Sequence, residues 1–229
     1  AAGKVRVICP DVVGRGQSDW LADPAGYQLG TYAADMVALL TQLAPRPTGL
    51  DWVGTSMGGL IGMLLCGQPE SPLPVPVRHL VLNDVGPTIE SAALARIGQF
   101  LGKRMQFDTL RDAADALWAH SSGFGPHTPA QWLALSAHMV KPLGAGSGEC
   151  MCADVAQTGP VVLHYDPAIA QAFGASAPEV VAQGEAVLWQ LYDHISAQTL
   201  VLRGAQSDLL SAQTARAMGQ RGPMARVVE

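Results

Sequence analysis

One serine in the sequence has neighbours that favour nucleophilic chemistry. Ser56 stands in the stretch GTSMGG, after the apolar run 49–54 and before the nearly all-apolar run 57–67. A serine hydroxyl attacks a carbonyl group only when a base removes its proton. A tight turn from a strand into a helix would hold the hydroxyl clear of the backbone and aim the first free N–H groups of the helix at the same space. The stretch therefore predicts a serine nucleophile.

The glycines around Ser56 fit such a turn for a steric reason. We expect a side chain at Gly54 or Gly58 to collide with neighbouring backbone, and Gly59 to let the helix pack closely. The backbone N–H of Met57 would then supply half of an oxyanion hole. A phosphate-binding loop is the alternative for a glycine-rich turn, but no lysine follows these glycines.

The elements that must position Ser56 alternate along the chain. Apolar runs predict strands at 5–9, 49–54, 77–86, 199–204 and 225–229, and helical patterns fall at 31–43, 57–67 and 211–220. This alternation is typical of a mostly parallel α/β sheet with helices on both faces. Between 88 and 196 the pattern becomes helical, which predicts a helical insertion and no second sheet domain. Thr31 is expected to cap the helix 31–43, and Thr128 with Gln131 to form a capping box.

Composition limits the kind of protein. The 229 residues, 48% hydrophobic and 14% charged, are enough for one large domain or a domain with an insertion. The net charge of −5 gives no basic footprint for nucleic acid, and no apolar stretch approaches the roughly 18 residues that predict a membrane span. The four cysteines do not resemble a disulfide framework, and Cys150 and Cys152 lack the partners of a zinc site. We therefore expect reduced thiols, no metal and a cytoplasmic protein.

Four stretches, GTSMGG, ICPDVVGRGQSDW, LVLNDVGP and LVLRGAQSD, together resemble the α/β-hydrolase superfamily, in particular bacterial esterase-like and lipase-like members with a helical cap. The resemblance covers nearly the whole chain. It implies that 1–87, starting at the fourth strand of the fold, and 197–229 form a partial hydrolase core, and that 88–196 form the cap. It also implies that the loop 10–18 lies beside the active site, with glycines that are structural, and that 163–170 return from the cap.

The family orders its catalytic residues as serine, acid, histidine. The resemblance places the acid at Asp208, four residues after Gly204, where it would orient the histidine and stabilise the imidazolium. Asp84, after the strand in LVLND, is the rival acid. As alternatives, Asp208 could only cap the next helix, and Asp84 could bond the backbone around the first turn of the cap.

No histidine follows Asp208 in the sequence. The six histidines are His79, His120, His127, His138, His164 and His194. We therefore expect the base of Ser56 to lie outside these 229 residues, and we interpret the chain as an internal fragment, truncated at both ends and inactive by itself. A homologue that has lost its histidine and its activity is the alternative.

The sequence predicts a cofactor-free serine hydrolase that cleaves a carboxylic ester or related acyl bond of a small molecule. A serine at the turn argues against dehalogenases and epoxide hydrolases, which need a carboxylate nucleophile. Carbon–carbon bond hydrolases, lactonases and acyltransferases of the same fold stay open, as does a non-catalytic binding protein that keeps the pocket. Trp118, Trp132 and Trp189 are expected in a largely apolar cap, which favours a moderately apolar acyl or aromatic substrate. The oligomeric state is not specified.

Overall fold

The computed structural model describes residues 5–121, 123, 125–145, 159–173 and 178–229, and its contacts divide the chain into two compact units. The sheet unit combines Ala25–Leu101 with Ala170–Glu229, and the smaller unit combines Ala1–Pro24 with Gly102–Ile169. These boundaries fall at 101/102 and 169/170, whereas the sequence suggested 87/88 and 196/197. Cys150 and Cys152 lie outside the described residues.

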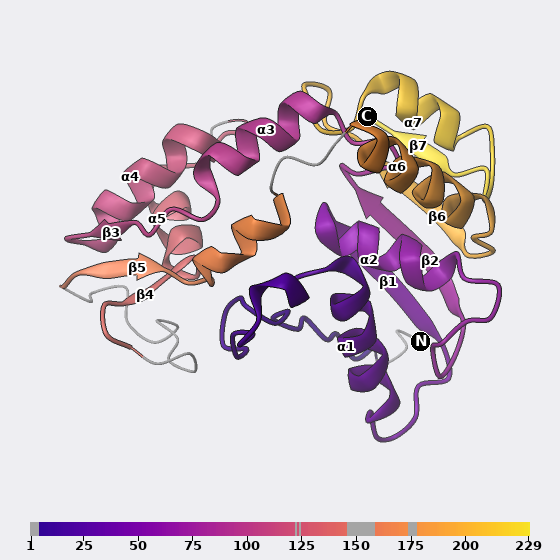
Figure 1. The fold of residues 1–229 in the computed structure, drawn as a ribbon, viewed down its shortest axis with the longest axis horizontal. Helices are drawn as coiled ribbons and strands as arrows, with labels where there is room; N and C mark the ends of the chain where they lie inside the picture. Colours follow the sequence, from indigo (N-terminus) through magenta and orange to yellow (C-terminus); the bar gives the residue numbers. More distant parts are fainter. Residues whose placement is uncertain (1–4, 122, 124, 146–158, 174–177) are drawn as a thin grey trace. The chain divides into compact units, whose positions relative to one another are not determined.

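The sheet unit is built on four parallel strands in the order β1-β2-β6-β7 (Figure 1). The strands are β1 (Leu50–Thr55), β2 (Val77–Asn83), β6 (Gln198–Leu202) and β7 (Arg226–Val228). The helices are α1 (Leu29–Thr41), α2 (Met57–Cys66), α3 (Ser91–Phe100), α6 (Pro178–Asp193) and α7 (Ala212–Met218). Because every neighbouring pair of strands is parallel, all four carboxyl ends lie at one edge of the sheet.

Apolar side chains of β2 and α2 form the centre of the sheet unit. Leu80 and Leu82 of β2 and Met63 of α2 are fully buried. Helix α2 packs on β1 and β2 and also contacts α1 and α6. Strand β1 ends the order of the described sheet, and its Val53 is 75% exposed. Helix α2 is therefore packed against both strands, with its buried side chains against Leu80 and Leu82 at the centre of the unit.

The smaller unit contains α4 (Leu110–Ser121), α5 (Pro129–Ala137) and an antiparallel sheet in the order β3-β5-β4. Its strands are β3 (Gln106–Phe107), β4 (Val140–Pro142) and β5 (Val161–Leu163). Sequence analysis expected helices in this region and did not identify the three strands, because strands of two or three residues are too short to produce an alternating pattern. The capping box of Thr128 and Gln131 at the start of α5 is confirmed. Two 3₁₀ helices, Pro24–Gly26 and Pro167–Phe173, complete the described elements.

Two further local predictions were wrong. Residues 5–9, expected to form a buried strand, have no regular secondary structure, and Val5 and Val7 are 82% and 85% exposed. An apolar β-branched run becomes a strand only beside a partner strand, and the described residues provide none for it. Helix α1 begins at Leu29 with Gln28 as its N-cap, so Thr31 lies in the first turn and does not cap it.

The stretch DVVGRGQS folds into a closed turn of the smaller unit. The carboxylate of Asp11 accepts a hydrogen bond from the Gln17 N–H at 2.9 Å, and the Ser18 hydroxyl donates to the Asp11 carbonyl at 2.6 Å. A Cβ on Gly16, whose φ is +55°, would stand 2.2 Å from the Asp11 Cγ. The Gly16 N–H donates to the His164 carbonyl at 3.1 Å. Gly16 is therefore structural, while the placement of this loop beside the active site stays a prediction.

Candidate active site

Ser56 occupies the turn between the end of β1 and the start of α2, at the carboxyl edge of the sheet. Its φ of 49° and ψ of −120° lie in a region that side-chain-bearing residues rarely adopt. Such a conformation persists only where the surrounding structure enforces it. The Ser56 N–H donates to the Asn83 carbonyl of β2 at 3.1 Å. The sheet therefore fixes the backbone of this residue, with the strained geometry expected of a nucleophile turn.

The three glycines around Ser56 have different roles. A Cβ on Gly54 would stand 2.3 Å from the carbonyl oxygen of Gly58, and one on Gly59 would stand 2.5 Å from Cγ1 of Val85. Neither position leaves room for a side chain. The prediction that a side chain at Gly58 would collide with its neighbours was wrong, because a Cβ there would lie within 4 Å of none of the described residues considered. Gly58 instead contributes its carbonyl, which accepts a hydrogen bond from Trp52 Nε1 at 2.9 Å.

The helix leaves the Ser56 hydroxyl and the Met57 N–H available for chemistry. Ser56 is the N-cap of α2, yet its side chain makes no capping hydrogen bond. Its carbonyl accepts from the N–H groups of Gly59 and Leu60, at 2.9 and 3.2 Å. The Met57 N–H opens the helix, where N–H groups have no acceptor within the helix and carry the positive end of its dipole. A negative charge developing on a substrate oxygen at this point would be stabilised.

Asp208 lies in the loop after β6, where its carboxylate pairs with Arg96 of α3. The Arg96 Nε is 2.8 Å from Oδ2 and its Nη2 is 2.9 Å from Oδ1, which makes a two-pronged contact. Both side chains are more than half exposed. Asp208 is not the N-cap of α7, because the hydroxyl of Ser211 takes that role and accepts from the Thr214 N–H.

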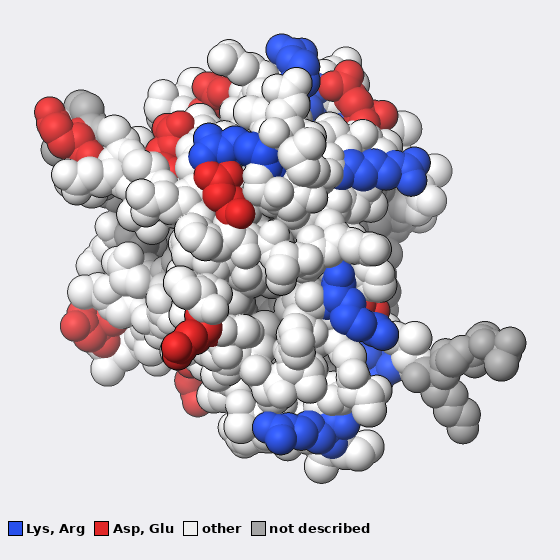
Figure 2. Space-filling model, turned by 90° about the vertical axis from the view of Figure 1, so that its right-hand side faces the viewer, with Lys and Arg blue, Asp and Glu red and all other residues white. Residues whose placement is uncertain are grey.

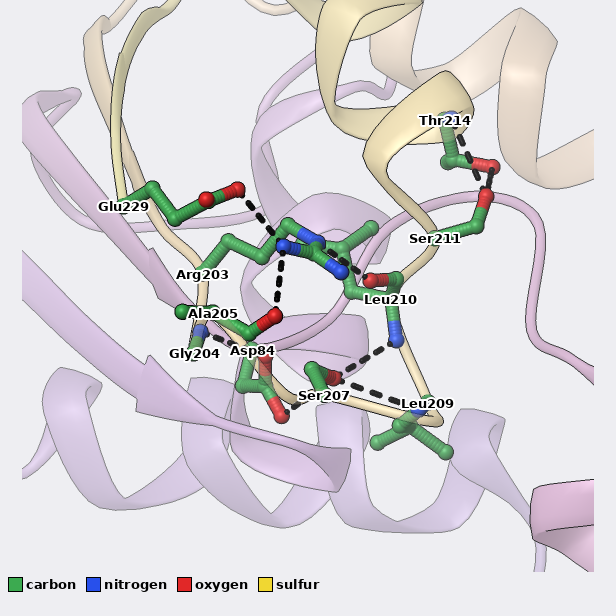
Figure 3. A network of polar contacts seen from close by, with 10 residues as sticks. All are labelled: Asp84, Arg203, Gly204, Ala205, Ser207, Leu209, Leu210, Ser211, Thr214 and Glu229. Atoms are coloured by element: carbon green, nitrogen blue, oxygen red, sulfur yellow. Dashed lines mark hydrogen bonds and ion pairs between the residues drawn. The ribbon is translucent and has the colours of Figure 1, made fainter.

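Asp84 follows β2 directly and is bound to the loop that carries Asp208 (Figure 3). Its Oδ1 accepts from the Gly204 N–H at 3.2 Å, and its Oδ2 accepts from the Ser207 hydroxyl at 2.8 Å. Its own N–H donates to the Leu202 carbonyl of β6 at 2.8 Å. The prediction that Asp84 bonds the first turn of the cap was wrong about the partner, because these contacts belong to β6 and the loop after it.

Neither histidine of the sheet unit lies at the edge that holds Ser56. His79 pairs in register with Asp51, and its Nδ1 is 2.8 Å from the Asp51 Oδ1. Asp51 precedes Ser56 by five residues along β1, which corresponds to roughly 16 Å of strand. His194 stands before β6, at the amino edge, with its Nδ1 2.7 Å from the Gln190 carbonyl. The other four histidines belong to the smaller unit.

Among the described residues, no group of three or more His, Cys, Asp or Glu side chains could hold a metal ion. None of the described helices has the length and apolar character needed to cross a membrane. On the face shown in Figure 2, basic and acidic side chains are scattered among a larger area of uncharged residues.

Comparison with known proteins establishes the family. The model of the Alpha/beta hydrolase family matches residues 1–229, and the chain belongs to this family. The expected fold and the resemblance found in the sequence are thereby confirmed.

One curated relative and two solved structures illustrate the similarity. The 3-hydroxybutyrate-oligomer hydrolase of Cupriavidus necator is 46% identical over 227 residues, which cover 99% of this chain and 72% of that protein. An α/β hydrolase from Novosphingobium aromaticivorans is 33% identical with a TM-score of 0.74, over 96% of this chain and 70% of that one. A putative hydrolase from Rickettsia typhi is 26% identical with a TM-score of 0.72, over 94% and 66%.

Sequence reasoning missed two residues that contact the candidate acid or its loop. Arg96 is a single arginine on a helix, and nothing in its spacing connects it with a residue 112 positions later. Ser207 carries a local signal, because a serine two and three residues before free N–H groups often bonds them in a turn. Its bonds to the Leu209 and Leu210 N–H groups fit that pattern.

Proposed function

We propose that the protein is a serine hydrolase that cleaves the ester bonds of short 3-hydroxybutyrate oligomers. The observation that carries this proposal is the turn at Ser56. This residue has a positive φ, and its side chain makes no capping hydrogen bond, so its hydroxyl lies at the carboxyl edge of the sheet. The curated relative at 46% identity, which is named for hydrolysis of 3-hydroxybutyrate oligomers, supports the substrate class. Asp208 is the proposed acid.

The reaction would proceed through an acyl-enzyme. The Ser56 Oγ attacks the ester carbonyl carbon while a histidine, oriented by Asp208, takes the hydroxyl proton. The Met57 N–H stabilises the oxyanion. The carbonyl re-forms as the ester C–O bond breaks, and the histidine gives its proton to the leaving oxygen, which becomes the hydroxyl group of the neighbouring hydroxybutyrate unit. Water then attacks the acyl-enzyme in the same way and releases the carboxylic acid.

An oligomer cleavage assay on the native protein tests this function. We expect the 3-hydroxybutyrate trimer to give dimer and monomer, with kcat about 10⁶-fold lower in the Ser56→Ala variant. The Ser71→Ala variant is the matched control, because Ser71 lies in an exposed loop and should keep the wild-type rate. A Ser56→Ala variant that retains its rate would refute the proposal. Binding of the trimer without turnover by the wild type would support the non-catalytic alternative.

A further inference from the structure

The loop Gly204–Leu210, which carries Asp208, is tied to the end of β2 by one hydrogen-bonded pair of side chains (Figure 3). We propose that Asp84 and Ser207 form a positioning pair that holds the proposed acid in register with the nucleophile. This inference rests on the proposed function, in which Asp208 orients the histidine. It gives Asp84, the rival acid, a different role in the same site.

Ser207 fixes the loop on both sides of Asp208. Its hydroxyl donates to the Asp84 Oδ2 at 2.8 Å and accepts from the N–H groups of Leu209 and Leu210, at 3.2 and 3.1 Å. Its own N–H donates to the Gly204 carbonyl at 2.9 Å. Because the hydroxyl proton is directed at Asp84 and its oxygen at the two N–H groups, the Ser207 side chain has one orientation that satisfies all three partners.

Asp84 connects this loop to the turn of the nucleophile. It directly follows Asn83, whose carbonyl accepts the Ser56 N–H, and its own N–H pairs with the Leu202 carbonyl. A short series of contacts therefore runs from Ser56 through Asn83 and Asp84 to Ser207, the residue before Asp208. The φ of Asp84 is +55°, a strained value that the adjacent pairing with β6 enforces.

A carboxylate is required at position 84 because two donors converge on it. The Gly204 N–H and the Ser207 O–H each need an acceptor oxygen. Asparagine offers one oxygen and one N–H₂ group, so it would place a donor against a donor at one of the two contacts. Asp84→Asn therefore breaks the pair with little change in volume.

The other end of the loop is held independently by Arg203. The Arg203 side chain is only 9% exposed, and its Nε donates to the Leu210 carbonyl at 2.8 Å. Its Nη1 donates to the Glu229 carboxylate at 2.6 Å (Figure 3). Loss of the Asp84–Ser207 pair should therefore displace Asp208 locally and leave the loop attached to the sheet.

The test compares four variants of the native protein in trimer hydrolysis: Asp84→Asn, Ser207→Ala, Ser207→Thr and Asp208→Asn. We expect Ser207→Ala and Asp84→Asn to lower kcat about 10- to 100-fold and to leave KM within twofold of the wild type. A small misplacement of catalytic groups lowers the rate by factors of this size. Ser207→Thr keeps the hydroxyl and should restore most of kcat.

The pH dependence of kcat/KM separates positioning from stability. A carboxylate beside a histidine favours the charged imidazolium and raises the pKa of the histidine. A displaced Asp208 should therefore move the acidic limb of the profile to lower pH, in the same direction as Asp208→Asn. Ser211→Ala is the matched control, because it removes a helix-capping hydroxyl near the loop and should lower stability without moving the limb.

Three outcomes would overturn an assignment. The positioning role is wrong if Asp84→Asn and Ser207→Ala keep kcat within threefold of the wild type and leave the pH profile of kcat/KM unchanged, while Asp208→Asn lowers kcat more than 1000-fold. If Asp84→Asn lowers kcat more than 1000-fold and Asp208→Asn does not, Asp84 is itself the acid. If Ser56→Ala, measured alongside, remains active, the proposed function fails, and the positioning role fails with it.

Discussion

At the scale of single residues, the fold holds Ser56 and Asp208 in different ways. The backbone of Ser56 is fixed in a strained turn by its neighbours in the sheet and in α2. Asp208 is held through its loop, while its exposed carboxylate rests against an exposed arginine. An exposed ion pair contributes little to stability, so the carboxylate can exchange this partner for another donor at small cost.

Replacement of Arg96 by glutamine tests that interpretation. We expect the free energy of unfolding, measured by urea denaturation, to fall by less than about 1 kcal/mol, because both charges are exposed. The value of kcat/KM should stay within about tenfold, whereas Asp208→Asn should lower it about 10⁴-fold by analogy with other serine triads. An Arg96→Gln variant as inactive as Asp208→Asn would show that the guanidinium itself takes part in the site.

The histidines of the sheet unit give a second prediction at this scale. His79→Gln and His194→Gln should keep kcat/KM within about threefold of the wild type. His79 pairs with Asp51, roughly 16 Å of strand from Ser56, and His194 precedes the amino end of β6. Esterase kinetics on the two variants check this. A loss of several orders of magnitude in either variant would contradict the geometry.

At the scale of elements, the packing of α2 on β1 depends on glycines that are not interchangeable. Gly54→Ala should lower the unfolding free energy by about 3 kcal/mol, since the new Cβ would stand 2.3 Å from the Gly58 carbonyl. Gly58→Ala should leave it unchanged or raise it by up to about 1 kcal/mol, because the position is helical and open. Urea denaturation of the two variants measures the difference, and equal losses would contradict it.

The burial of α2 also determines the reactivity of its cysteine. Burial raises the pKa of the Cys66 thiol to about 11. Because the thiolate is the reactive form, only about one molecule in 1000 would carry it at pH 8. Alkylation at pH 8, followed by mass spectrometry, should therefore modify the exposed Cys9 well before Cys66. Faster modification of Cys66 would show that α2 is less protected than the structure indicates.

The elements nearest Ser56 could be predicted from sequence, and the more distant ones only in part. The runs at 57–67 and 77–86 carry apolar side chains that the helix and the strand bury, and this pattern is readable from the sequence. The run at 49–54 was also predicted correctly as a strand, although β1 ends the described sheet and is largely exposed. The run at 5–9 is also apolar and β-branched but forms no strand, because strand formation depends on pairing with a neighbouring strand, which composition does not encode. The small sheet of the smaller unit depends on pairing in the same way.

At the scale of the whole molecule, each compact unit is formed from two separate stretches of the chain. Helix α6 belongs with the sheet because its side chains contact the segment after β2. The Thr88 hydroxyl donates to Glu185 at 2.5 Å and accepts from Trp189 Nε1 at 2.9 Å. Tyr192 donates to the Met218 carbonyl at 2.7 Å. Two of these bonds span about 100 residues, so a change in composition along the chain could not place the boundary between units.

In the candidate site, too, local features could be predicted from the sequence and long-range contacts could not. The turn at Ser56 is a local feature, and its residues could be recognised from the glycines around Ser56 together with the apolar runs on either side. The contacts of Asp84 with Gly204 and Ser207 bridge more than 100 positions and become visible only when β2 and β6 pair in parallel. The sequence could therefore propose two acids but could not show what each one contacts.

Covalent labelling of Ser56 tests the central claim most directly. The native protein would be treated with a fluorophosphonate, which reacts with activated serine hydroxyls, and the adduct mapped by mass spectrometry of tryptic peptides. We predict one modified serine, Ser56, with labelling lost in the Ser56→Ala variant and slowed in Asp208→Asn. An unlabelled Ser56 in a protein that hydrolyses the trimer, or an adduct on another serine that survives Ser56→Ala, would contradict the assignment of Ser56 as the nucleophile.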